Sequence, residues 1–179
     1  DGPTVRLAPW AMLDLGAIGK GWALDRAADV LRDAGITLAL LHGGTSSVLA
    51  LGAPPDQPGW RVLIRSAAQP RSITLTDSAL GVTAALGHRD PSSPEPDPRA
   101  DGSREHLVDP ASGRLLRIGP IDTAAIVGPS AALCDAWSTA MAVLSLREPA
   151  PAAAARLPPA YESHLHGPDG WTCHLATPC

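Results

Sequence analysis

The apolar residues of this chain follow two spacings, which divide it into helical and extended segments. Between Trp22 and Ala34, apolar side chains recur every three or four positions with charged residues between them. That spacing predicts an amphipathic helix, and Gly35 is suited to end it. A second, more apolar helix is predicted from Ala131 to about Leu144, with Ser130 as its N-cap.

The shorter apolar runs predict strands. The continuous, partly β-branched run at 36–41 predicts a buried strand. The full set of predicted strands covers residues 4–7, 36–41, 48–51, 60–65, 72–76, 80–85, 105–108, 123–127, 161–166 and 171–175. A helix, many strands and then a second helix favour an α+β fold with a mixed, largely antiparallel sheet. The polar, proline-rich segment 87–104 is predicted to be a mobile loop.

Composition excludes several classes of protein. Hydrophobic residues make up 45% of the chain, which is typical of a globular domain with a substantial core. The net charge of −4 leaves no basic stripe, so nucleic acid is not an expected partner. No run approaches the roughly 18 apolar residues of a transmembrane segment.

The cysteines and histidines form no recognisable metal-binding motif. Three cysteines are too few for a disulfide scaffold, and Cys134 lies in the apolar pattern of the second helix. Cys173 and Cys179 could form a disulfide in an oxidising compartment, and the sequence does not decide whether they do. His164 and His166 would share a strand face, but no zinc-finger spacing is present, so zinc is not predicted.

The glycine-rich stretch from Asp14 to Gly21 offers the first candidate chemistry. Three glycines surround Lys20 just before the first predicted helix. Backbone N–H groups at a helix N-terminus, together with a lysine, suit a phosphate or pyrophosphate. The stretch matches neither the P-loop nor the dinucleotide-binding glycine pattern, and a plain strand-to-helix turn is an equal alternative.

The second predicted helix offers a candidate cation site. Asp135 and Thr139 lie four residues apart, so they share one face of a helix whose other residues are mostly apolar. A carboxylate is costly to bury there unless it is paired or bound to a cation, and the two oxygens suit Mg²⁺. An exposed acid beside a threonine bonded to its own helix is the alternative. His106, before the turn that begins at Asp109, is a candidate general base.

Taken in order, these motifs resemble the ApbE family, the FAD:protein FMN transferases. The matching stretches are the glycine turn at 14–21, the paired glycines at 43–44, the His-Leu-Val-Asp-Pro-Ala-Ser-Gly run at 106–113 and Asp-Ala-Trp-Ser-Thr-Ala at 135–140. The resemblance covers about residues 5–146 and implies an ApbE-like, T-fold-like domain over the whole chain. It implies an Mg²⁺-dependent enzyme that transfers FMN from FAD to a threonine or serine hydroxyl of a target protein, releasing AMP.

The resemblance also assigns expected roles to residues. Lys20 and the glycine turn would hold the FAD pyrophosphate, and His106 would deprotonate the acceptor hydroxyl. Asp135 and Thr139 would hold Mg²⁺, with the backbone carbonyl of Gly19 as a third ligand. The expected FAD-binding residues are Asp14, Gly16, Gly19, Lys20, Gly43, Gly44, Thr45 and Asp109.

Two departures from the family pattern keep alternatives open. Thr45 follows the paired glycines where the family usually has an acid, and only 13 residues precede Asp14 where the family has a longer segment. We therefore expect an N-terminally truncated or fragmentary chain. An FAD pyrophosphatase, in which water replaces the acceptor hydroxyl, and a non-catalytic flavin-binding module are the alternative functions. The resemblance implies a location in the bacterial cell envelope, and the sequence itself leaves the compartment open.

Overall fold

A six-stranded antiparallel sheet forms the middle of the fold. The computed structural model describes residues 2, 4–65, 69–84, 107–115 and 121–175. The strand order is β1-β2-β5-β8-β9-β10, and every neighbouring pair is antiparallel. The strands are β1 (Ala39–His42), β2 (Ser47–Leu51), β5 (Ala79–Ala84), β8 (Thr123–Gly128), β9 (Glu162–Gly167) and β10 (Gly170–Leu175).

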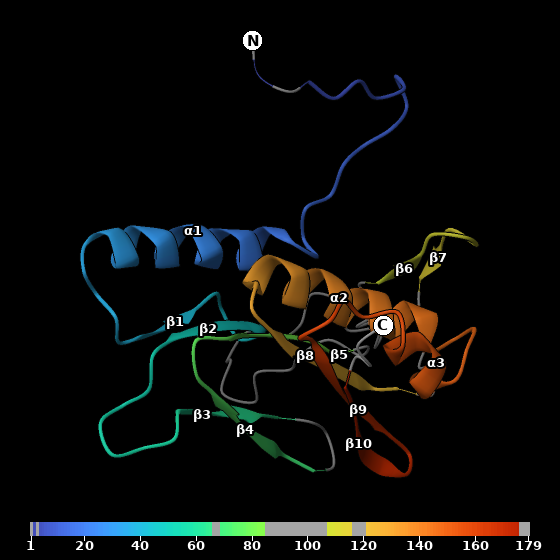
Figure 1. Cartoon of the computed structure of the whole chain (residues 1–179). Coiled ribbons are helices and arrows are strands. Elements are labelled where there is room, and N and C mark those ends of the chain that lie inside the picture. Colours follow the sequence, from blue (N-terminus) through green and yellow to red (C-terminus); the bar gives the residue numbers. More distant parts are fainter. Residues whose placement is uncertain (1, 3, 66–68, 85–106, 116–120, 176–179) are drawn as a thin grey trace, which may run out of the picture.

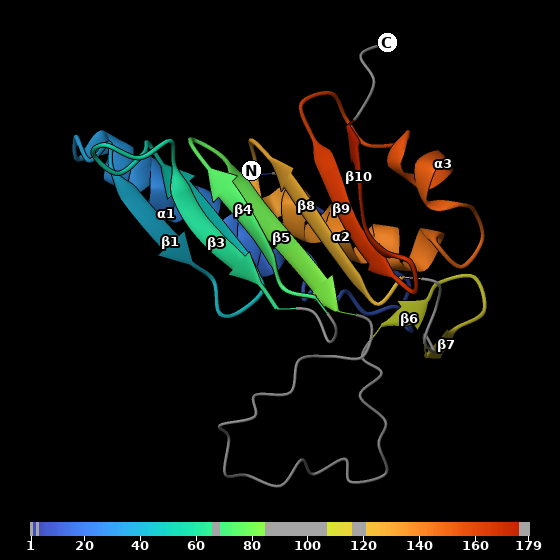
Figure 2. The same ribbon diagram turned by 90° about the horizontal axis from the view of Figure 1, so that it is seen from below.

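Helices cover one face of this sheet and a β-hairpin covers part of the other (Figures 1 and 2). The helices are α1 (Gly19–Asp33), α2 (Ala131–Leu144) and the short α3 (Ala150–Ala154). The hairpin consists of β3 (Trp60–Ile64) and β4 (Arg71–Leu75). A small pair, β6 (Val108–Asp109) and β7 (Arg114–Leu115), lies apart from both sheets in the strand pairing.

The period-two alternation of the strands divides the core into two layers. In β2, Leu49 and Leu51 pack with the helices, whereas Val48 and Ala50 pack with the β3–β4 hairpin. Every residue of β2 is buried, because the strand has a covering layer on each face. The β3–β4 hairpin therefore accounts for the continuous apolar run of this strand.

Two glycines allow α2 to approach its neighbours closely. A Cβ atom at Gly21 of α1 would lie 2.1 Å from the carbonyl oxygen of Ala131, and one at Gly81 of β5 would lie 2.4 Å from that of Cys134. Neither position has room for a side chain, so α2 contacts the backbone of both elements directly. This contact brings residues far apart in the sequence to the start of α1.

Asp25 of α1 fixes the beginning of α2. Its carboxylate accepts hydrogen bonds from the amides of Ala131 and Ala132, at 2.8 and 3.1 Å, and from the Ser130 hydroxyl at 2.8 Å. The Ser130 oxygen in turn accepts a hydrogen bond from the Leu133 amide at 3.3 Å, as expected of an N-cap. Asp25 thus satisfies amides that a helix N-terminus otherwise leaves without partners.

Most of the predicted elements are confirmed, with shifted boundaries. The α+β fold with a largely antiparallel sheet is confirmed, as is α2 with its Ser130 cap. The first helix begins at Gly19, three residues before the predicted start at Trp22, so the glycine-lysine turn is partly helical.

Other expectations were wrong. Residues 4–7 form no strand, and Val5 is 78% exposed, because no neighbouring strand pairs with this segment. The predicted strand at 36–41 begins only at Ala39 and is half-buried, since β1 lies at the sheet edge. Helix α3 was missed in an alanine- and proline-rich connection, where Pro151 occupies an early helical position that tolerates proline.

Some expectations lie beyond what the structure tests. The predicted loop at 87–104 and the first half of the predicted strand at 105–108 fall outside the described residues; of the second half, Leu107 lies outside any strand and Val108 begins β6. Cys179 also lies outside the described residues, so its pairing with Cys173 stays untested. Within the described part of the chain, none of the helices has the length and apolar character needed to cross a membrane.

Candidate functional site

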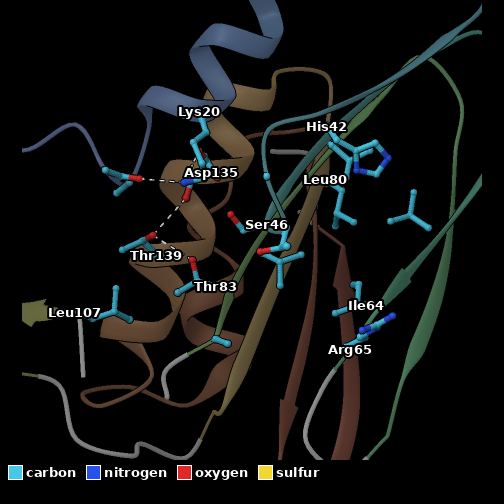
Figure 3. Close-up of a pocket in the computed structure, with 18 of the residues that line it drawn as sticks. Lys20, His42, Ser46, Ile64, Arg65, Leu80, Thr83, Leu107, Asp135 and Thr139 are labelled. Atoms are coloured by element: carbon cyan, nitrogen blue, oxygen red, sulfur yellow. Dashed lines mark hydrogen bonds and ion pairs between the residues drawn. The ribbon is translucent and has the colours of Figure 1, made fainter. Parts of the chain in front are cut away.

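A cavity of about 970 Å³ lies where the start of α1, the β1–β2 turn, β3, β5 and α2 meet. One side is formed by Lys20, Thr83, Asp135 and Thr139, and the opposite side by side chains that include His42, Ile64 and Leu80 (Figure 3). The remaining lining residues are Asp14, Gly16, Ala17, Gly44, Thr45, Ser46, Val48, Val62, Leu63, Arg65, Val82, Ala84, Leu107 and Val108. The cavity thus has a polar wall on the helix side and a largely apolar wall on the hairpin side.

Asp135 is the buried charge of the polar wall. It is 3% exposed, and its Oδ1 accepts a hydrogen bond from the Ser47 hydroxyl at 2.6 Å. Its Oδ2 accepts a hydrogen bond from the Gly21 amide at 2.9 Å and lies 3.5 Å from the Lys20 ammonium nitrogen. These partners offset the cost of burying a carboxylate in an apolar helix. The alternative of an exposed acid is therefore wrong.

A chain of hydroxyl groups continues this wall along α2. Thr139 Oγ1 lies 3.1 Å from Thr83 Oγ1, which lies 2.8 Å from Ser138 Oγ. Ser138 donates to the backbone carbonyl of Asp135 at 2.9 Å, and Thr139 contacts the same carbonyl at 3.5 Å. Asp135 and Thr139 share the face that lines the cavity, as their spacing predicted.

The N-terminus of α1 offers fewer free amides than the sequence led us to expect. The Gly19 amide donates to the Leu15 carbonyl at 2.7 Å, and the Trp22 amide donates to the Ile18 carbonyl at 2.9 Å. The Gly21 amide is already bonded to Asp135. The positive group that this turn presents to the cavity is therefore the Lys20 side chain, which is 43% exposed and also donates to the Gly16 carbonyl at 3.2 Å.

The other residues of the glycine turn divide into lining and supporting positions. Asp14 and Gly16 line the cavity, and the Asp14 carboxylate closes the turn by accepting from the Gly16 amide at 2.7 Å. Gly19 is the first residue of α1 and is not among the lining residues.

The paired glycines hold the β1–β2 turn. Gly44 and Thr45 line the cavity, and Gly44 has a φ of 72°, which favours glycine. Gly43 is not a lining residue; its amide donates to the Ser47 carbonyl at 2.8 Å. Gly43 thereby helps to position Ser47, whose hydroxyl donates a hydrogen bond to the buried Asp135.

The Asp109 carboxylate forms hydrogen bonds within the turn that follows it. Its carboxylate accepts hydrogen bonds from the Ser112 hydroxyl at 2.7 Å and the Ala111 amide at 3.2 Å, and it pairs with Arg147. These contacts, the Ser112 hydroxyl foremost, lower the pKa of Asp109. Asp109 is not among the residues that line the cavity, and its expected part in FAD binding stays a prediction. His106, which precedes Leu107 in the sequence, lies outside the described residues, whereas Leu107 and Val108 line the cavity.

Sequence reasoning missed two hydroxyl residues and the apolar wall. Ser47, just before the predicted strand at 48–51, is fully buried in β2 against Asp135. Thr83 lies on the face of β5 that meets α2, where its hydroxyl contacts Thr139. The alternation of side chains along β5 could have predicted that Thr83 lies on the other face from Leu80 and Val82. Only the fold reveals that β3 supplies Val62 and Ile64 to the cavity.

With the fold and this cavity described, comparison with known proteins identifies the family. The ApbE family model matches residues 4–163, so the chain belongs to the ApbE family. Among curated proteins, an FAD:protein FMN transferase from Rhodobacter capsulatus is 33% identical over 154 residues, which are 79% of this chain and 26% of that protein. One from Salmonella typhimurium is 27% identical over 145 residues, 78% of this chain and 39% of that protein. The chain therefore spans well under half the length of these curated relatives.

Solved structures support the same fold. The flavin transferase ApbE of Vibrio cholerae superimposes with a TM-score of 0.66 at 21% identity, covering 92% of this chain and 50% of that one. The ApbE protein of Thermotoga maritima gives a TM-score of 0.69 at 20% identity, covering 92% of this chain and 51% of that one. At these identities the comparison establishes a shared fold, which confirms the expected ApbE-like fold.

Proposed function

We propose that this chain provides the FAD-binding and catalytic part of an enzyme that transfers FMN from FAD to a threonine or serine hydroxyl of a target protein, releasing AMP. One observation carries the proposal: a buried carboxylate, a lysine and a threonine face one cavity in a chain of the ApbE family. Its relatives are named FAD:protein FMN transferases.

The size and lining of the cavity fit a large, amphipathic ligand. About 970 Å³ lies at the upper end of the range of small-molecule sites. Val48, Val62 and Leu80 offer apolar surface for an aromatic ring system, and the opposite wall carries Lys20 and Asp135. A molecule with flat rings at its ends and a pyrophosphate between them requires both kinds of wall.

The donor atoms near Asp135 suit Mg²⁺. A carboxylate and two threonine hydroxyls are hard oxygen ligands, and Mg²⁺ fills its remaining positions with water and substrate phosphate. Asp135 and Thr139 would hold the ion, which supplies neutralisation of charge on the phosphate oxygens. The Gly19 carbonyl, expected as a third ligand, has less support because Gly19 does not line the cavity.

Lys20 would act as the cation that receives the pyrophosphate. Its ammonium group lies 3.5 Å from Asp135 Oδ2, beside the oxygen that a metal ion would also contact. An Mg²⁺ ion held by Asp135 would therefore compete with the Lys20 ammonium group for this carboxylate. His106 would accept the proton of the acceptor hydroxyl, a role that stays a prediction since the residue lies outside the described part.

Replacing Lys20 with methionine separates these two effects. We expect Lys20→Met to weaken FAD binding by about 10- to 100-fold, because a charge-assisted hydrogen bond contributes about 1.5–3 kcal/mol. The same change should strengthen Mg²⁺ binding in the absence of FAD, because the competing ammonium group is gone. Titration calorimetry with each ligand measures both quantities.

A matched control for this variant is available on the same helix. Arg26→Met removes a positive charge that pairs with Asp29 and does not line the cavity. It should leave both affinities unchanged. Equal losses of FAD affinity in the two variants would mean that Lys20 acts only through the general charge of the protein.

The function itself is tested by incubating the chain with FAD and Mg²⁺, with and without a threonine-containing acceptor peptide. AMP release together with a covalently fluorescent acceptor supports transfer. AMP and free FMN without labelling would instead indicate an FAD pyrophosphatase, and FAD binding without AMP would indicate a binding module. Absence of FAD binding contradicts the proposal for this chain.

A further inference from the structure

Three potential metal ligands meet on the sheet face that points away from the helices, near its β10 edge. Glu162 and His164 lie two residues apart on β9 and therefore share a face. Cys173 of β10 is the antiparallel partner of His164 in the strand register. One ligand atom from each of these residues lies within 4.8 Å of the other two. The strand register thus brings Cys173 beside His164, a proximity that their spacing in the sequence did not predict.

One ring nitrogen of His164 has a hydrogen-bond partner and the other has none in the described structure. The residue is only 6% exposed, and its Nε2 lies 2.8 Å from Glu162 Oε1. Its Nδ1 is buried without a hydrogen-bond partner within the described structure. Burial lowers the pKa of His164, although Glu162 opposes this shift.

We propose that Glu162, His164 and Cys173 bind a Zn²⁺ ion, with solvent as the fourth ligand. Nitrogen, sulfur and carboxylate oxygen are the zinc donors of proteins, and a tetrahedral ion holds them about 3.3–3.6 Å apart. Separations within 4.8 Å need only side-chain adjustment to reach this geometry. The thiol is unsuited to Mg²⁺, and none of the three residues lines the large cavity, so the site is distinct from the proposed FAD site.

The charges around the cluster are compatible with a divalent cation. Glu162 and a Cys173 thiolate supply two negative charges. The positive charge of Arg71, whose guanidinium lies 5.6 Å from the Trp171 ring centroid, opposes the ion but favours the thiolate. Zinc binds cysteine as the thiolate, so the Cys173 thiol would release its proton to solvent when the ion binds.

His166, the next residue on this face, is not needed as a ligand. Its Nδ1 lies 2.9 Å from the carboxylate of Asp122, and its ring meets the Trp171 ring edge-on at a centroid distance of 5.1 Å. This packing holds the β9–β10 pair beside the cluster.

The test uses Co²⁺ as a spectroscopic substitute for Zn²⁺. The full chain, reduced and freed of metal, is titrated with Co²⁺. We expect one equivalent to give the near-ultraviolet thiolate-to-cobalt charge-transfer band and the visible bands of a tetrahedral ion, and Zn²⁺ to displace it. Cys173→Ser should remove the charge-transfer band, and Glu162→Gln should weaken binding at least about tenfold, since even changes to outer-shell groups cost that much.

Cys179→Ser is the matched control, because it removes a second cysteine close in the sequence and should leave the cobalt spectrum unchanged. Circular dichroism checks that Cys173→Ser stays folded, which its exposed position on an edge strand favours. A wild-type chain that shows no charge-transfer band, or a band that persists in Cys173→Ser, overturns the proposal.

Discussion

Replacing Asp135 with asparagine should abolish Mg²⁺ binding and Mg²⁺-dependent AMP release while the chain stays folded. The asparagine oxygen can still accept from the Gly21 amide, and its NH₂ group can donate to the Ser47 oxygen, so one hydrogen bond to each buried partner remains. Only the negative charge is lost. Mg²⁺ titration calorimetry and AMP release from FAD measure the effect.

The alanine variant at the same position should behave differently. Asp135→Ala leaves the Gly21 amide and the Ser47 hydroxyl buried without their acceptor, at a cost of about 2–4 kcal/mol in the free energy of unfolding. Lys20 adds little to this figure because its side chain is 43% exposed. Urea unfolding followed by circular dichroism separates this loss of stability from the loss of function.

The exposed acid Asp33 at the end of α1 provides a control. Asp33→Asn changes the net charge equally and should leave stability and Mg²⁺ binding unaltered. Retention of Mg²⁺-dependent AMP release in Asp135→Asn would mean that the metal ligand has been assigned to the wrong residue.

Adding a single methyl group at Gly21 should destabilise the protein by about 3 kcal/mol, lowering the Tm by roughly 6–12 °C. The new Cβ would lie 2.1 Å from the Ala131 carbonyl oxygen, which belongs to backbone and cannot rotate away. Helix α1 must then move from α2, which lengthens the 2.9 Å hydrogen bond from the Gly21 amide to Asp135. FAD and Mg²⁺ binding should weaken as well. Thermal unfolding and calorimetry measure both effects.

Gly19→Ala is the matched substitution on the same helix. Its Cβ would lie 3.7 Å from the Leu15 Cβ, an ordinary contact, and alanine has the better helix propensity. This variant should be at least as stable as the parent chain. If Gly21→Ala were equally stable, the close packing of α1 on α2 would not hold the carboxylate in place.

Local sequence patterns predicted the helices and strands better than they predicted how the strands pair. The Ser130 cap, the helix after it and most strands follow from short-range patterns, and the structure contains them. The patterns failed at 4–7 and at 36–38, where strand formation depends on whether a neighbouring strand pairs with the segment. Pairing is a non-local property that an apolar run does not contain.

The candidate site shows the same division. The four-residue spacing on α2 determined that Asp135 and Thr139 share a face, and motif order determined the ApbE family, which the family match confirms. Only the tertiary structure decided that Asp135 is buried against Ser47 and Gly21, that the α1 amides are mostly occupied, and that Asp109 closes its own turn. Helical periodicity is fixed by nearby residues, whereas the partners of a buried charge come from elements 88 and 114 residues away, which only the packed fold brings together.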